Sequence, residues 1–210
     1  MDEEITLRDT APLATGRSRL VFQHPEHPDY LIKVIRPEII EERFGSGTKW
    51  YKRLRRFGRF LSYHREIEEY LAVYASHHRA LPFLPEIIGF AKTDLGLGLV
   101  IRAIKTPDGQ LAPSIGKILY ERRETPEIKE ALEKCFTEIV NCDVIISDLN
   151  VGNFVHLEHE NRFVLIDGTG NASPLALKGY SRALNRRHKL RRIKKFRTRM
   201  ERYRQQFRDS

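Results

Sequence analysis

The sequence has few cysteines and no long apolar run. Only two cysteines, Cys135 and Cys142, occur among 210 residues, too few for a disulfide framework and without the spacing of zinc ligands. We therefore expect two buried thiols in a reducing compartment. No segment approaches the roughly 20 apolar residues that cross a bilayer, and the acidic N-terminal stretch lacks the features of a secretory signal. These absences argue against export, membrane spanning and a zinc fold, and we expect a cytoplasmic protein.

The positive charge is concentrated in one segment. Residues 178–210 contain 14 Lys and Arg against two acids, a net charge of +12, whereas the other 177 residues hold 23 basic and 26 acidic groups. The overall net charge of +9 therefore says little about the body of the protein. Hydrophobic residues make up 40% of the chain, enough to build the core of one domain or of two small lobes.

The basic segment 178–210 predicts an amphipathic helix. Apolar residues recur at spacings of three and four, namely Leu190, Ile193, Phe196, Met200, Tyr203 and Phe207. We expect this stripe to pack on the protein or on a second copy. Binding of the basic face to an anionic membrane surface or a partner protein is the next interpretation. Specific nucleic-acid binding is not expected, because no helix-turn-helix, RNA-recognition signature or finger is present.

The order of predicted elements favours an α+β protein. Apolar and β-branched runs predict strands at residues 20–22, 30–35, 86–92, 97–104, 154–157 and 163–166. Helical periodicity and capping predict helices at residues 38–42, 60–77, 115–122 and 126–141, besides the basic helix. Residues 14–19 (ATGRSR) predict a turn of small residues. Residues 43–59 hold seven basic residues and no acid, and predict a loop with a partial helical turn, either solvated or docking a phosphate or a partner.

Four polar motifs occur in the order typical of a protein-kinase ATP site. Lys33 lies inside the strand YLIKVI, and Glu66 lies on the following helix. An Asp-x-x-x-x-Asn motif runs from Asp148 to Asn153, and Asp167, followed by glycine, comes 19 residues after Asp148. Each motif alone has a simpler explanation as an edge-strand lysine, a helix-surface glutamate or a turn. The ordered set predicts a nucleotide site.

Helix phase selects the carboxylate that would hold Lys33. Glu66 flanks the apolar face of the helix, whereas Glu69 is expected to point to solvent and Glu68 is the fallback. An ammonium group on a rigid strand can contact the α and β phosphates of ATP when a carboxylate holds it in place.

The remaining motifs suit metal and proton chemistry. Mg²⁺ takes oxygen ligands and keeps several waters, so Asp167 and Asn153 are sufficient as its protein ligands. Asp148 would accept or orient the proton of an incoming hydroxyl group. Gly16, with Arg17 and Arg19, would bring backbone N–H groups and positive charge near phosphate.

From residue 14 to the segment DGTGNASPLAL, the chain resembles the YrbL family of bacterial PhoP-regulon proteins, which are related to the protein-kinase-like superfamily. The resemblance implies a two-lobed kinase-like fold. Residues 1–104 would form a β-rich N-lobe with the basic insertion 43–59, residues 105–177 a reduced helical C-lobe with the catalytic and metal loops, and residues 178–210 the basic helix.

The resemblance also implies binding of Mg-ATP and transfer of phosphate to a hydroxyl acceptor in a PhoP-type regulatory network. Ile146-Ser147 replaces the His-Arg that precedes the catalytic aspartate of typical kinases, and Asn150 replaces a common lysine, which removes one cation. Only 43 residues follow Asp167, so a small molecule, sugar or lipid is the expected acceptor rather than a peptide. The alternatives are a pseudokinase or nucleotide sensor acting through the basic helix, and a nucleic-acid or anionic-membrane adaptor. A position peripheral to the inner membrane is the alternative to a freely cytoplasmic location.

Overall fold

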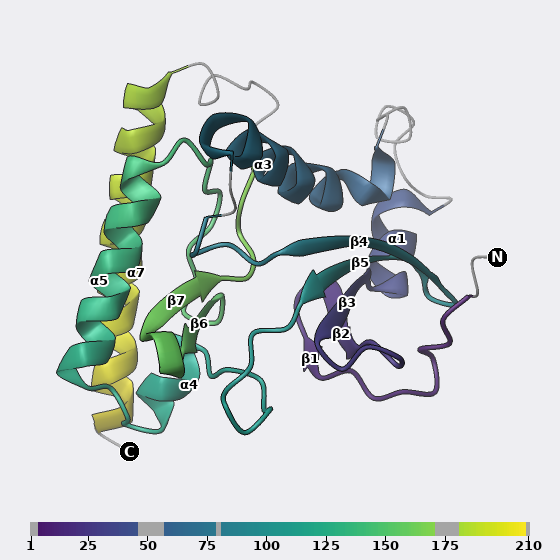
Figure 1. Cartoon of the computed structure of the whole chain (residues 1–210), viewed down its shortest axis with the longest axis horizontal. Coiled ribbons are helices and arrows are strands. Elements are labelled where there is room, and N and C mark those ends of the chain that lie inside the picture. The colour runs from purple at the N-terminus through teal and green to yellow at the C-terminus, as the bar shows by residue number, and fades with distance from the viewer. Residues whose placement is uncertain (1–3, 46–56, 79–80, 171–180, 209–210) are drawn as a thin grey trace. The chain divides into compact units, whose positions relative to one another are not determined.

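The computed structural model describes residues 4–45, 57–78, 81–170 and 181–208 (Figure 1). The chain divides into two compact units: unit 1 contains Met1–Ile67 and Glu86–Ala103, and unit 2 contains Glu68–Pro85 and Ile104–Ser210. Helix α3, Leu61–His77, begins in unit 1 and ends in unit 2. Antiparallel sheet and helices occur together, which confirms a mixed α+β protein.

Unit 1 is built on a five-stranded antiparallel sheet with the strand order β1-β2-β3-β5-β4. Its strands are β1 Ala14–Thr15, β2 Arg19–Gln23, β3 Tyr30–Ile35, β4 Ile87–Thr93 and β5 Gly96–Arg102. The last four lie close to the predicted positions. The assignment of residues 14–15 to a turn was wrong, because two small residues show no apolar alternation and become a strand only by pairing with β2.

Strand β3 is the central strand, and its side chains alternate between two apolar layers. Leu31 and Ile35 pack in a cluster with Tyr63 of α3, while Ile32 and Val34 pack in the layer on the other face. Lys33 has the same parity as Leu31 and Ile35, so period-two geometry directs it to the face covered by α3. A central strand with both faces buried leaves no solvent-facing edge for this lysine.

The helices of unit 1 precede and follow the basic insertion. Helix α1 spans Pro37–Phe44, longer than predicted, and begins with proline at the position where its missing N–H costs nothing. A short 3₁₀ helix, η1, spans Gly58–Phe60 and leads into α3. Most of the predicted loop 43–59 lies outside the described residues.

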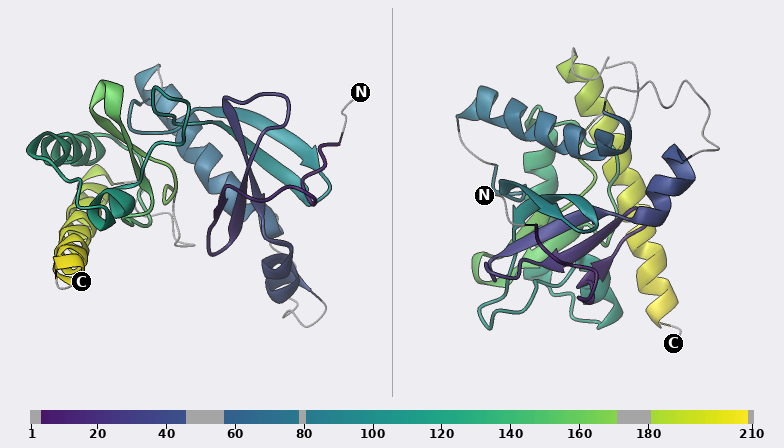
Figure 2. Two further views of the ribbon diagram at one scale, coloured as in Figure 1. Left: turned by 90° about the horizontal axis from the view of Figure 1, so that it is seen from below. Right: turned by 90° about the vertical axis from the view of Figure 1, so that its right-hand side faces the viewer.

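Unit 2 contains three helices and a two-stranded sheet among its described residues, besides the end of α3. These elements are α4 Ile115–Tyr120, α5 Pro126–Asn141, β6 Phe154–Leu157, η2 Glu158–Glu160, β7 Arg162–Leu165 and α7 Arg182–Arg208. Helices α5 and α7 lie side by side in opposite directions (Figures 1 and 2). Arg204 near the end of α7 pairs with Glu124 before α5, and Arg182 at its start pairs with Asp143 after α5.

The basic helix α7 is part of the core of unit 2. Phe196 is fully buried, and its ring centroid lies 5.3 Å from that of Phe136 in α5 and 5.1 Å from that of Phe154 in β6. Ile193 and Met200 are buried beside it. The prediction that the apolar stripe packs on the protein is therefore confirmed for its middle, whereas Leu190 and Tyr203 are exposed and the side chain of Phe207 lies outside the described residues.

Both cysteines are buried free thiols, as predicted, and burial raises the pKa of each. No helix in the described ranges is both long enough and apolar enough to span a bilayer.

Candidate functional site

Lys33 and Glu66 form a buried ion pair in unit 1. The Nζ atom of Lys33 lies 3.5 Å from Oε2 of Glu66, and the guanidinium group of Arg19 pairs with the other carboxylate oxygen. The exposed fractions of Lys33, Glu66 and Arg19 are 5%, 8% and 9%. One carboxylate therefore holds two cations in place, one on β3 and one on β2.

Tyr63, one helical turn before Glu66, attaches α3 to the sheet. Its hydroxyl oxygen lies 2.8 Å from the carbonyl oxygen of Lys33 and 3.1 Å from that of Leu97. Burial raises the pKa of Tyr63 to about 12, so the hydroxyl group keeps the proton that it donates. The guanidinium carbon of Arg19 lies 5.4 Å from the centre of the Tyr63 ring. These contacts determine where Glu66 meets Lys33.

Gly16, Arg17 and Arg19, which were expected to form a phosphate loop, have three different environments in the structure. Arg19 joins Lys33 and Glu66, as described above. Arg17 is exposed. The N–H of Gly16 donates to the carbonyl oxygen of Arg19 at 2.8 Å, which closes the turn between β1 and β2. The amide of Gly16 is thus engaged inside the hairpin.

In unit 2 the loop that carries Asp148 is bonded to the loop that carries the Asp-Gly motif. The N–H groups of Ser147 and Asp148 donate to the carbonyl oxygen of Gly168 at 2.8 and 3.2 Å, and the Ser147 hydroxyl lies 3.0 Å from the same oxygen. Ile146 and Thr169 form an antiparallel bridge beside these bonds. The two motifs, which are 19 residues apart in the sequence, therefore form one local structure.

Asn153 and Asp167 belong to the same structure. The backbone carbonyl of Asn153 accepts the N–H of Ile166 at 2.8 Å, and a carboxylate oxygen of Asp167 accepts the N–H of Gly168 at 2.7 Å. The side chain of Asn153 lies beside the Asp-Gly motif, because a Cβ atom built on Gly168 would lie 3.6 Å from the Asn153 side-chain nitrogen. Asp167 is exposed and Asn153 half-buried, so both side chains remain accessible.

The donor set in unit 2 fits Mg²⁺ better than a softer metal. The described residues contain no group of three or more His, Cys, Asp or Glu that could hold a metal by themselves. Mg²⁺ does not need such a group, because it retains waters and shares its shell with substrate phosphates. A carboxylate and an amide oxygen are ligands of the kind that Mg²⁺ takes, and Asp167 and Asn153 are the residues that would supply them.

Helix α7 supports the Asp148 loop, a role that the sequence analysis missed. Its side chains bond to five backbone carbonyls of residues 142–149: Lys189 to Cys142, Asn185 to Asp143 and Val144, His188 to Ile146, and Arg199 to Leu149. Asn185 and Lys189 are 3% and 1% exposed. Asn185, an uncharged amide among the arginines at the start of this helix, was the available signal for a buried polar face.

Two arginines of α7 lie next to Asp148. The Nη1 atoms of Arg192 and Arg199 lie 4.0 and 3.9 Å from a carboxylate oxygen of Asp148. Asn150 stands where many kinases have a lysine, so one cation is lost from the loop itself. The structure brings two cations of α7 to this loop, from positions more than 40 residues further along the chain.

The prediction that Glu69 points to solvent was wrong. Its exposed fraction is 5%, and its carboxylate accepts the N–H of Ile145 at 2.7 Å. Burial raises the pKa of Glu69 to about 7, opposed by the hydrogen bond from Ile145 and by the charge of Lys189. The error arose because α3 has two buried faces: Glu69 shares a face with Val73, which belongs to the core of unit 2.

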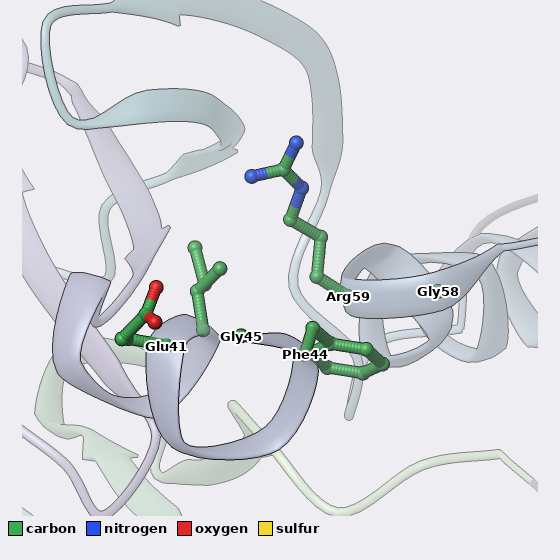
Figure 3. Close-up of a pocket in the computed structure, with 6 residues that line it drawn as sticks. Glu41, Phe44, Gly45, Gly58 and Arg59 are labelled. Carbon is green, nitrogen blue, oxygen red and sulfur yellow. The ribbon is translucent and has the colours of Figure 1, made fainter. Parts of the chain in front are cut away.

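A cavity of about 370 Å³ in unit 1 is separate from these residues (Figure 3). Its lining residues come from α1 and η1 and the residues next to them, namely Ile40, Glu41, Phe44, Gly45, Gly58 and Arg59. Of the described residues that line this cavity, none belongs to the predicted nucleotide set.

These features define an α+β protein with one buried cation–carboxylate cluster and one carboxylate–amide loop pair. The chain belongs to the family described as PhoP regulatory network protein YrbL, whose family model matches residues 5–201. The match includes every residue named above for the site. A comparison with curated proteins finds no match.

Proposed function

We propose that this protein binds Mg-ATP and transfers a phosphate group to a hydroxyl acceptor, as a protein-kinase-like member of a PhoP regulatory network. Unit 1 would act as the β-rich N-lobe and unit 2 as the reduced helical C-lobe that ends in the basic helix. The observation that carries the proposal is the Lys33–Glu66 pair. A carboxylate from a helix holds a lysine on the central strand of an antiparallel sheet, as phosphate binding in kinases requires.

Each residue has a defined task in this proposal. Lys33, positioned by Glu66 and accompanied by Arg19, would bind nucleotide phosphate oxygens. Asp167 and Asn153 would hold Mg²⁺, which supplies charge neutralisation on the phosphates. Asp148 would orient the acceptor hydroxyl and accept its proton. Its side chain is 52% exposed, so an acceptor can reach it.

The expected acceptor is a small molecule, a sugar or a lipid headgroup. A second candidate function is a pseudokinase that binds nucleotide without transfer. It draws support from the phosphate loop, which has a single glycine whose N–H is already engaged in the hairpin. Both candidates predict a cytoplasmic protein that binds nucleotide, and they differ only in turnover. An adaptor that binds nucleic acid or an anionic membrane through its basic helix predicts no specific binding of nucleotide.

Thermal unfolding with ATP, with and without Mg²⁺, tests the proposal. A ligand that binds only the native state raises the unfolding midpoint. We expect a Mg²⁺-dependent rise for the wild type that is lost in K33M and D167N. The controls K134M and E130Q make the same charge changes on the exposed face of α5 and should keep the rise.

Turnover separates the two candidates. D148N should still bind Mg-ATP while ADP release in the presence of an acceptor falls by about 100-fold or more. Binding by the wild type without any turnover would favour the pseudokinase. Absence of a shift at millimolar ATP would contradict both.

A further inference from the structure

We propose that the face of α7 next to Asp148 binds a phosphate group carried by the acceptor. The substrate would then be a hydroxyl compound that is already phosphorylated. The role of this compound as an acceptor rests on the proposed phosphate transfer. Binding of an anion to α7 can be tested independently of that function.

A cavity of about 510 Å³ lies along this face of α7. The described residues that line it are His188, Arg191, Arg192, Lys194, Lys195 and Thr198. Arg192 lines the cavity and also lies 4.0 Å from the Asp148 carboxylate. Positions 188, 192, 195 and 199 fall on one side of a helix, so Arg199 extends the same face. We refer to the six residues that line the cavity, together with Arg199, as the cavity face. The cavity and the candidate catalytic carboxylate therefore adjoin.

The cavity face has an excess of positive charge. Arg192 and Arg199 pair with the Asp148 carboxylate, and in the described part of the chain no other carboxylate pairs with the five Lys and Arg residues of this face. Three cations of α7 outside this face have acids of their own: Arg197 pairs with Glu133, Arg204 with Glu124 and Arg182 with Asp143. Five Lys and Arg residues on the cavity face thus share one carboxylate, which is an arrangement that attracts an anion.

Stability does not explain the charge of the cavity face. The pairs with Asp148 are 3.9 and 4.0 Å long, and the side chains of Arg192 and Arg199 are 34% and 48% exposed. Such exposed pairs contribute little to folding, and like charges three or four residues apart destabilise a helix. A bound anion would relieve that repulsion.

The chemistry of the cavity face selects phosphate. Guanidinium groups donate in a planar fork that matches phosphate oxygens. Arg199 is held by its bond to the carbonyl oxygen of Leu149 at 3.2 Å, so part of its fork is already oriented beside Asp148. A phosphate bound to Arg192 and Arg199 would place a hydroxyl group of the same molecule near the Asp148 carboxylate.

The transfer step balances without any further reactant. The acceptor hydroxyl oxygen forms a bond to the γ-phosphorus of ATP, and the bond from that phosphorus to the β–γ bridging oxygen breaks. ADP leaves with the bond electrons, and the hydroxyl proton passes to Asp148. The product carries two phosphate groups, and the arginines hold the one that was present from the start.

Inorganic phosphate is the probe for the anion site. Isothermal titration calorimetry would compare the full-length wild type, R192Q/R199Q and the control R186Q/R197Q. The control removes the same charge from the same helix, on the side away from the cavity face. We expect the cavity-face variant to lose at least about tenfold in phosphate affinity, while the control keeps it. No phosphate binding by the wild type, or an equal loss in both variants, would overturn the proposal.

Acceptor chemistry is tested with glycerol 3-phosphate, which carries both a phosphate and hydroxyl groups. ADP release by the wild type should rise with glycerol 3-phosphate but not with glycerol, and the rise should be lost in R192Q/R199Q. Vesicles of phosphatidylglycerol present the same headgroup chemistry, so stimulation by vesicles alone identifies a lipid as the source. Equal stimulation by glycerol would overturn the requirement for phosphate.

Failure of the two proposals can be told apart. Phosphate binding that depends on Arg192 and Arg199 without any binding of Mg-ATP supports the anion site and contradicts the kinase function. If R192Q/R199Q loses the binding of both Mg-ATP and phosphate, both arginines would be assigned to the nucleotide. That result would overturn their role toward the acceptor.

Discussion

Gly168 lies directly against the backbone of Asp148. A Cβ atom at position 168 would come within 2.0 Å of the Asp148 carbonyl oxygen, and the φ angle of Gly168 is +97°. The Gly168 carbonyl in turn accepts the N–H of Asp148. The glycine of the Asp-Gly motif is therefore needed for the contact between the two loops, besides its role in the turn after β7.

Replacing Gly168 should therefore be costly. We expect G168A to lower the free energy of unfolding by about 2–4 kcal/mol, because it adds a positive-φ penalty to a clash with immobile backbone. Urea unfolding measures the change. G152A is the matched control in the same region, since a Cβ there meets nothing within 4 Å. Equal stability of both variants would contradict the observed loop contact.

The Glu66 carboxylate should matter more than a surface acid. E66Q leaves Arg19 and Lys33 in the same buried place without the shared negative charge. We expect a loss of about 3 kcal/mol in unfolding free energy. K33M/E66Q should lose less than the sum of its single variants, because removing a buried cation relieves part of that cost. Additive losses in a urea double-mutant cycle would show that the two side chains do not interact.

Glu69 predicts a pH dependence of stability. Its folded pKa of about 7 lies above the usual 4.5, so the folded state binds the proton more tightly than the unfolded state. Stability from this group is therefore complete below pH 4.5 and is lost as the pH rises through 7. The full loss amounts to up to about 3 kcal/mol.

E69Q should remove this dependence while keeping an acceptor for the Ile145 N–H. We expect it to unfold at a higher urea concentration than the wild type at pH 8, and the two to converge near pH 5. E130Q, which makes the same change at an exposed position of α5, is the control. Parallel pH profiles for E69Q and the wild type would refute the assignment.

The basic helix should be indispensable for folding. F196A removes a fully buried ring between α5 and β6, and we expect it to lower the unfolding free energy by about 3–5 kcal/mol. L190A on the same helix should change stability by less than about 1 kcal/mol, because Leu190 is 49% exposed. A mild effect of F196A would mean that α7 is a detachable tail.

Sequence periodicity was sufficient for most of the elements. The alternation in YLIKVI and the apolar spacing of residues 60–77 led to β3 and α3, and helical periodicity with capping led to α5. Strand β1 could not be predicted in the same way. Its two residues carry no pattern, and only pairing with β2 makes them a strand.

The candidate site was partly predictable, because its residue types and their order are local properties of the sequence. Lys33, Glu66, Asp148, Asn153 and Asp167 are chemically distinctive residues in an informative order, so the sequence named them. The partners of these residues were not predictable. Arg19 pairs with Glu66 across a sheet and a helix, and Arg192 and Arg199 approach Asp148 from α7. Such pairs depend on packing between distant segments, which local spacing does not encode.

By itself the sequence determined the residue types of the site, their order along the chain and the strands and helices that carry them, because those properties are local. Tertiary structure decided which charges meet. It buried Glu69 by giving α3 a second packed face, it placed Ile193, Phe196 and Met200 of α7 in the core, and it brought cations of α7 beside Asp148. The physical reason is that burial and charge pairing depend on which surfaces pack together, and packing is a property of the whole fold.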